Sequence, residues 1–127
     1  MGIKMRYGAG GGNSGGSTVH IDRLWENPDP TVSFAAQTID VDLTGYRFFG
    51  VILQFATNTE DNPPMQVFEV DETRKELVIN GTASNRVGGR HVTYDSSAGT
   101  LTFDTAYYNG SAANGNVIPL RIFGIFI

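Results

Sequence analysis

Residues 36–43 read AQTIDVDL, and this stretch shows the cleanest alternation of apolar and polar side chains in the chain. Ile39, Val41 and Leu43 are expected to face one side, whereas the polar residues between them face the other. A period of two is typical of a β-strand that has one buried and one solvated face. The stretch therefore predicts a strand whose apolar side faces a core.

Strand patterns continue on both sides of this stretch. Residues 46–55 (YRFFGVILQF) form a nearly continuous apolar run, as expected for a strand that is covered on both faces. No segment combines helical periodicity with caps. Further strand patterns lie at residues 18–24, 65–70, 76–80, 90–94, 100–105 and 117–127. We therefore predict an all-β fold, a β-sandwich or jelly-roll-like domain of about 7–8 strands.

The connections between these strands carry turn signals. Residues 71–75 (DETRK) and 95–99 (DSSAG) each separate two neighbouring strand patterns, and each predicts a hairpin. Residues 106–116 (AYYNGSAANGN) are rich in Asn, Gly and Ala and are expected to form a loop. Pro119 predicts an edge position or a bulge in the last strand, because proline donates no hydrogen bond to a ladder.

A glycine-rich segment precedes the first strand pattern. Glycine loses more conformational freedom on ordering than any other residue, so the segment is either a flexible linker or an arm held by a neighbouring subunit. The expected organisation is an N-terminal arm at residues 1–17 and a β-sandwich domain at 18–127. The candidate assembly arm consists of Gly8, Gly10, Gly11, Gly12, Gly15 and Gly16.

Composition and charge argue against several classes of partner. The net charge is −4 without a basic cluster, which disfavours nucleic-acid binding, since phosphate neutralisation needs grouped Lys and Arg. The longest apolar tracts are only as long as strands, so we expect no membrane span and no signal peptide. The absence of cysteine excludes disulfides and thiol chemistry.

Residues that could carry catalysis or bind a metal lack the necessary spacing. His20 and His91 sit in strand patterns, so we interpret them as ordinary strand residues rather than as metal ligands. Asp40 and Asp42 resemble the start of a calcium loop, but Val51 occupies the position of its closing acidic ligand. We expect no enzymatic activity, no cofactor and no metal.

Two groups of residues are candidates for contact with partners. Tyr107, Tyr108 and Asn109 combine aromatic rings with an amide, as sugar-binding loops do. Trp25 can serve the same purpose or pack in the core. The apolar C-terminus predicts a strand that is central in a sheet or buried in a subunit interface. The candidate interface residues are Ile122, Phe123, Ile125, Phe126 and Ile127.

Four motifs follow one another along residues 24–127: LWENP at 24–28, FAAQT at 34–38, VDLTGY at 41–46 and IPLRIFGI at 118–125. This series resembles small structural proteins, of the fibre or tail type, of tailed bacteriophages and prophages of Gram-positive gut bacteria. The resemblance implies a virion protein, assembled in the host bacterial cytoplasm, that acts as a fibre, tail-tip or capsid-decoration module.

Such modules are often trimers, so the resemblance favours a homotrimer that contacts other virion proteins and, at its surface, a host glycan. The alternative hypothesis is a carbohydrate-binding module that recognises a cell-surface glycan.

Overall fold

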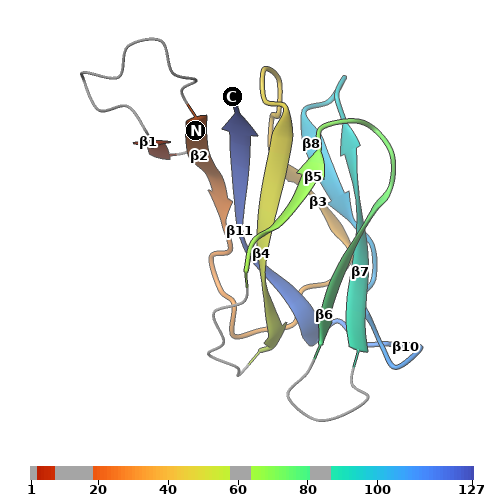
Figure 1. Cartoon of the computed structure of the whole chain (residues 1–127). Helices are drawn as coiled ribbons and strands as arrows, with labels where there is room; N and C mark the ends of the chain where they lie inside the picture. The colour runs from red at the N-terminus through yellow and green to blue at the C-terminus, as the bar shows by residue number, and fades with distance from the viewer. Residues whose placement is uncertain (1–2, 8–18, 58–63, 81–86) are drawn as a thin grey trace.

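The computed structural model describes residues 3–7, 19–57, 64–80 and 87–127, and within them the fold is all-β (Figure 1). This confirms the predicted fold class, with more strands than expected. The strands are β1 (Ile3–Tyr7), β2 (Val19–Glu26), β3 (Gln37–Asp40), β4 (Phe48–Ala56), β5 (Gln66–Glu69), β6 (Lys75–Asn80), β7 (Val87–Asp95), β8 (Thr100–Phe103), β9 (Tyr107–Tyr108), β10 (Ser111–Ala112) and β11 (Asn116–Phe126).

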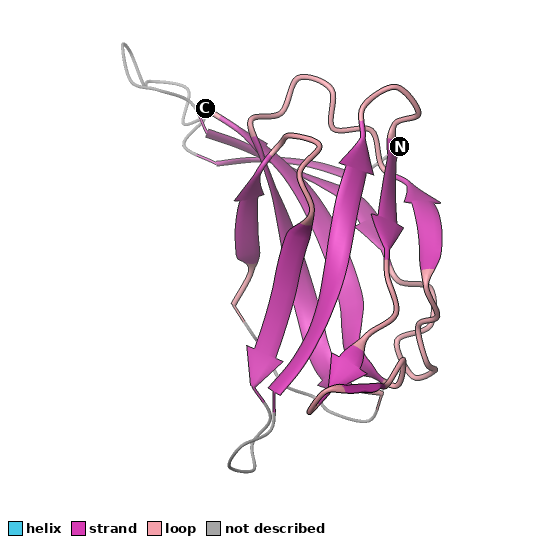
Figure 2. Ribbon diagram, turned by 90° about the vertical axis from the view of Figure 1, so that its right-hand side faces the viewer, coloured by secondary structure: helices cyan, strands magenta, loops and turns pink. Residues whose placement is uncertain are grey.

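The strands form two antiparallel sheets that pack as a β-sandwich (Figure 2). A five-stranded sheet has the order β1-β2-β11-β4-β5. In the six-stranded sheet, β7 pairs with β6 along one edge and with β8 and then β9 along the other. β3 extends the sheet beyond β8, and β10 extends it beyond β9.

The core lies between the sheets and is built from the inward-facing residues of both. Val41 and Leu43 are buried, as the alternation predicts, and so is Val51 of β4. β11 is central, because it pairs with β2 on one side and β4 on the other. The register of β11 against β4 shifts between Pro119 and Arg121, which confirms a bulge rather than an edge position.

The predicted hairpin around residues 71–75 is wrong. β5 pairs with β4 and β6 pairs with β7, so the chain passes from one sheet to the other at this turn. Gln66 of β5 joins the two edges: its Nε2 donates to the Val78 carbonyl (2.8 Å) and its Oε1 accepts from the Val78 amide (3.2 Å). The Gln66 side chain thus hydrogen-bonds the backbone amide and carbonyl of Val78, which the edge of β6 would otherwise expose to solvent.

The hairpin around residues 95–99 is confirmed, since β7 and β8 pair directly. A second, unexpected hairpin occupies the segment at 106–116 that was predicted to be a loop. β9 and β10 pair on either side of Asn109 and Gly110, whose φ angles of 49° and 85° are those of a two-residue hairpin turn. The strands are two residues long, too short to show an alternation in the sequence.

Arg90 of β7 lies between the two sheets and is completely buried. Its guanidinium donates to three carbonyls, those of Val117 (Nε, 3.1 Å), Asp104 (Nη1, 2.8 Å) and Asn116 (Nη2, 3.4 Å). The Phe34 ring lies 5.2 Å from the guanidinium carbon. Burial lowers the pKa of Arg90 to about 10, so the side chain stays charged at neutral pH. Arg90 therefore ties β7 of one sheet to β11 of the other.

The start of β11 has an unusual backbone where Arg90 binds it. Val117 has a φ of 52°, a conformation that a β-branched residue rarely adopts. Gly88 of β7 makes room for this segment, since a Cβ there would lie 2.8 Å from Cγ2 of Val117. The hydrogen bonds that Arg90 donates to the Val117 and Asn116 carbonyls offset the energetic cost of this backbone conformation.

We expect Arg90→Met to lower the free energy of unfolding by about 3 kcal/mol, because three carbonyls lose their donor. The matched control is Arg74→Met: Arg74 is exposed and pairs with Asp104 at 3.3 Å. Loss of such a surface pair should cost less than about 1 kcal/mol. Urea denaturation followed by circular dichroism measures both values, and equal losses would contradict the role given to Arg90.

Candidate functional site

The outer faces of the two sheets differ in chemistry. The outer face of the six-stranded sheet is polar, as expected for a solvated antiparallel sheet. Thr38 of β3 and Thr102 of β8 are hydrogen-bonded across strands there, with 2.8 Å between their hydroxyl oxygens. Glu76 and His91 of neighbouring strands lie on the same face. Val78 and Val87 also lie on this face and are 40% and 42% exposed.

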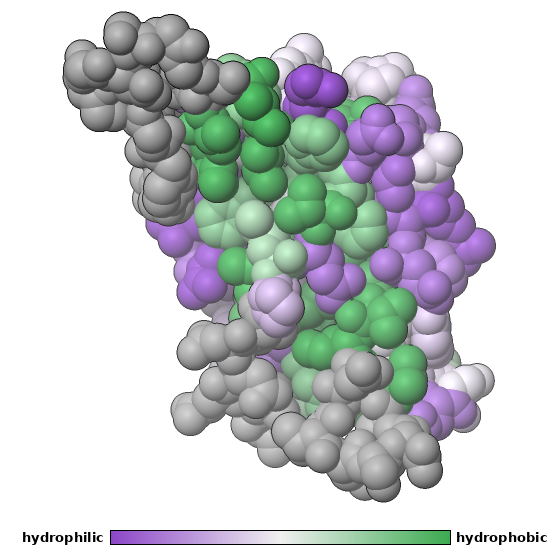
Figure 3. All heavy atoms as spheres, viewed as in Figure 1, coloured by the Kyte–Doolittle hydropathy of each residue, from purple (hydrophilic) through white to green (hydrophobic). Residues whose placement is uncertain are grey.

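The outer face of the five-stranded sheet carries a row of apolar residues. Register places Ile21, Ile125 and Phe48 side by side across β2, β11 and β4. Hydrophobic residues gather over β11, β4 and β5 in Figure 3, whereas hydrophilic residues dominate the side where β7 lies. We call this surface the β11 face; it consists of Ile21, Phe48, Ile52, Met65, Val67, Phe123 and Ile125.

Packing within the β11 face is close at its centre and open toward β5. Phe123 and Ile125 are each only 8% exposed, although they point away from the core. Met65 lies over Gly50, where a Cβ would come within 2.2 Å of the Met65 sulfur. Val67 of the edge strand β5 is 50% exposed. The face therefore joins apolar residues from β2 to β5, with Phe123 and Ile125 shielded at its centre and Val67 the most exposed of its large apolar residues.

Charged residues lie beside this surface and within it: in the register, Arg23 is opposite Phe123, Arg121 is opposite Ile52 and Glu69 is opposite Phe48. Glu26 at the end of β2 pairs with Arg23 (3.5 Å) and Arg121 (3.8 Å). At the other end, the guanidinium of Arg47 lies 5.7 Å from the centre of the Phe48 ring. Exposed ion pairs of this kind add little to folding stability. An apolar centre with a charged border is the usual composition of a protein–protein interface.

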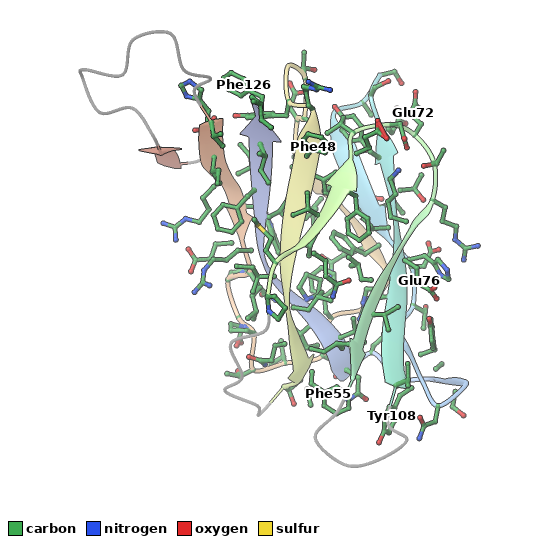
Figure 4. All side chains as sticks on the ribbon, in the orientation of Figure 1. Phe48, Phe55, Glu72, Glu76, Tyr108 and Phe126 are labelled. Atoms are coloured by element: carbon green, nitrogen blue, oxygen red, sulfur yellow. The ribbon has the colours of Figure 1, made fainter. Side chains whose placement is uncertain are left out.

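The C-terminal residues singled out in the sequence divide between the two sides of the sheet. Phe123 and Ile125 belong to the β11 face, whereas Ile122 is fully buried in the core. Phe126 stacks on His20, with ring centres 4.5 Å apart, and meets the edge of Tyr46 at 5.9 Å. Figure 4 shows Phe126 at the same end of the sandwich as Phe48.

Tyr46 fixes the end of β11 from the core side. A Cβ on Gly124 would lie 2.8 Å from the Tyr46 ring, so glycine lets the ring lie against the strand. The Tyr46 hydroxyl donates to Oδ2 of the buried Asp22 at 2.5 Å. Burial, with Asp22 adding to it, raises the pKa of Tyr46 to about 12. This contact holds the strand that carries Phe123 and Ile125.

The three residues predicted for surface binding lie elsewhere. Tyr107 lies over Gly89 of β7 and donates to Glu76, and this bond raises its pKa. Tyr108 packs against Phe55, with ring centres 5.7 Å apart, and Figure 4 shows the two together at one end of the sandwich. Asn109 forms the turn between β9 and β10. The structure thus gives each of the three a contact within the domain.

Tyr107 is the end of a polar network on the six-stranded sheet. Glu76 Oε2 lies 3.7 Å from His91 Nε2, and Arg74 Nη2 lies 3.1 Å from His91 Nδ1. Because a guanidinium can only donate, Nδ1 of His91 is the acceptor in this pair. The network lies on the face of the sheet and holds β6, β7 and β9 together through side chains.

The two histidines, whose imidazoles are possible metal ligands, lie in different sheets. His20 lies in the five-stranded sheet and His91 in the six-stranded sheet. The described residues contain no group of three or more His, Cys, Asp or Glu that could hold a metal ion. They also contain no helix long and apolar enough to cross a membrane. The candidate assembly arm from Gly8 to Gly16 lies outside the described residues, whereas β1, at 3–7, pairs with β2.

Tyr46 is expected to ionise well above the usual pH range of a tyrosine. Its pKa in the folded state is raised from 10.0 to about 12, so its stabilising contribution is complete below pH 10 and disappears as the pH rises toward 12. Absorbance at 295 nm should show one tyrosine ionising near pH 12 that is missing in Tyr46→Phe. The control Tyr107→Phe should keep it. Ionisation of every tyrosine near pH 10 in folded protein would contradict this prediction.

Comparison of the chain with protein-family models, with curated proteins and with solved structures finds no match in any of the three.

Proposed function

We propose that this chain is a structural module of a tailed-bacteriophage virion, of the fibre, tail-tip or capsid-decoration kind, which assembles as a homotrimer through its β11 face. The motif series at residues 24–28, 34–38, 41–46 and 118–125 suggests the virion role. The observation that supports the assembly is the five-stranded sheet, which carries apolar residues on its outer face as well as on its inner face.

The contrast between the two sheets supports an interface on one side only. A β-sandwich needs apolar residues on the two inner faces, and its outer faces are ordinarily polar. The outer face of the six-stranded sheet has mainly polar residues, such as Thr102, Glu76 and His91, whereas Phe48, Phe123 and Ile125 lie on that of the five-stranded sheet. Large contiguous apolar surfaces on soluble proteins mark contacts with a partner, because exposing them to water is unfavourable. The β11 face accordingly favours a protein partner over solvent.

The chemistry of the β11 face suits a second and third copy of the same chain. Around a symmetry axis, identical residues of the subunits meet one another, so charges there would repel. Phe123, Ile125 and Ile52 at the centre are uncharged. Arg23 and Glu26 at the border carry opposite charges and can pair between subunits. A homo-oligomer therefore satisfies both the centre and the border of the face.

The wild-type chain is expected to run as a trimer in size-exclusion chromatography with light scattering at micromolar concentration. The double variant Ile52→Glu, Val67→Glu places charges on the β11 face without entering the core and should yield a folded monomer. The matched control Thr93→Glu, Thr102→Glu places the same charges on the outer face of the six-stranded sheet and should leave the trimer intact. A monomeric wild type, or a trimer in the first variant, would refute this mode of assembly.

The virion role has its own test. Antibodies raised against the domain should label particles induced from the bacterial strain whose genome carries the gene, as seen by immunogold electron microscopy. Peptides of the chain should copurify with particles through a density gradient. If purified particles lack the chain while it is expressed in the same cells, the virion role is wrong, whatever the oligomeric state.

A further inference from the structure

A pocket of about 270 Å³ lies where the five-stranded sheet is connected to the six-stranded sheet by the segment between β2 and β3. Trp25 of β2 and Phe34 line it from the side of the core, and Gln37 and Ile39 line it from β3. Small-molecule sites usually measure roughly 300–1,000 Å³. The size therefore suits one small ring rather than a long polymer.

The connecting segment that forms the wall is fixed in place. The backbone amide of Asn27 donates to the Leu120 carbonyl (2.8 Å), and its side-chain amide donates to the Pro119 carbonyl (2.9 Å). Gln54 of β4 donates to the Pro30 carbonyl at 3.0 Å. These bonds attach the segment to β11 and β4, so the site is preformed. Binding a ligand would therefore cost little entropy for ordering the protein segment.

The apolar part of the pocket is aromatic. Trp25 is half-buried and meets Phe34 edge to face, with ring centres 6.0 Å apart. Val32 at the pocket is 53% exposed. Aromatic rings provide a large, rigid apolar surface for a ligand that is itself part apolar and part polar. The C–H groups on one side of a pyranose ring fit this description.

The polar part of the pocket provides acceptors and no cation. Asp29 Oδ1 accepts from the amide (3.1 Å) and hydroxyl (2.5 Å) of Thr31, which lowers the pKa of Asp29 and keeps it ionised. Gln37 donates to the Ala35 carbonyl (3.0 Å). Within the described residues these bonds leave Oδ2 of Asp29 and Oε1 of Gln37 as acceptors. None of the lining residues is Lys or Arg, so the pocket disfavours phosphates and carboxylates.

We propose that this pocket binds a single neutral sugar residue at the end or branch of a cell-surface glycan. Trp25 contacts the C–H face of the ring, and Asp29 and Gln37 accept hydrogen bonds from its hydroxyls. The site is separate from Tyr107, Tyr108 and the β11 face, and it requires neither trimer formation nor a virion role.

The chain contains one tryptophan, so Trp25 gives a single indole N–H signal in the NMR spectrum of the ¹⁵N-labelled full-length protein. The probes are the methyl glycosides of glucose, galactose, mannose and N-acetylglucosamine, added to millimolar concentration. At least one should shift the indole signal saturably, together with backbone signals of residues 27–39. The signals of β6 and β9 should stay in place.

Variants assign the contact to the pocket. Asp29→Asn keeps an oxygen for Thr31 and removes the charge, and it should raise the dissociation constant about tenfold. Gln37→Ala should weaken binding in the same direction. The control Tyr107→Phe, on the six-stranded sheet, should bind as wild type does. Backbone spectra that match wild type outside the pocket show that each variant is folded.

Three outcomes would overturn the proposal. The first is that no glycoside moves the indole signal. The second is that binding is unchanged in Asp29→Asn and Gln37→Ala, or is lost in Tyr107→Phe, which would put the sugar elsewhere. The third is that a proline-rich peptide moves the indole signal and no glycoside does, which would make the pocket a peptide site.

Discussion

The fold depends on one buried charge. Arg90 is carried by β7, and its guanidinium binds carbonyls at the start of β11 in the opposite sheet. A buried cation is costly unless its donors are all engaged, so the two strands are held at one separation and one register. The hydrogen bond from Arg90 to the Val117 carbonyl holds the backbone of Val117 at its positive φ. From that point β11 runs through the middle of the five-stranded sheet and determines which residues reach each face.

The two sheets share one core but meet different environments on their outer faces. The six-stranded sheet has threonines and the polar network of Tyr107, Glu76, His91 and Arg74, which contact with water favours. The five-stranded sheet has Phe123, Ile125 and Phe48 on its outer face. The two outer faces of the chain therefore differ in character, and the segment between β2 and β3, which joins the two sheets, carries the Trp25 pocket.

Glycine facing tyrosine recurs in this sandwich. Tyr46 lies over Gly124 in one sheet, and Tyr107 lies over Gly89 in the other. In each case the glycine lets the ring lie against a strand, while the tyrosine hydroxyl reaches a carboxylate, that of Asp22 or that of Glu76. The sequence shows the four residues but not the pairs, because the partners are distant along the chain. These contacts explain why Tyr107, singled out for its place beside a loop, also packs on a strand.

The sequence by itself determined where most strands lie and that the domain is all-β, because alternation and turn residues are local signals. It did not determine how strands pair: β5 and β6 are neighbours in the chain, yet they belong to different sheets and meet through the side chain of Gln66. The sequence shows that the C-terminus is apolar. It does not show which of these residues face the core, because an apolar run without alternation has no polar side. Only the tertiary structure decided that Ile122 fills the core while Phe123 faces outward, because that choice depends on the strands that pack on either side of β11.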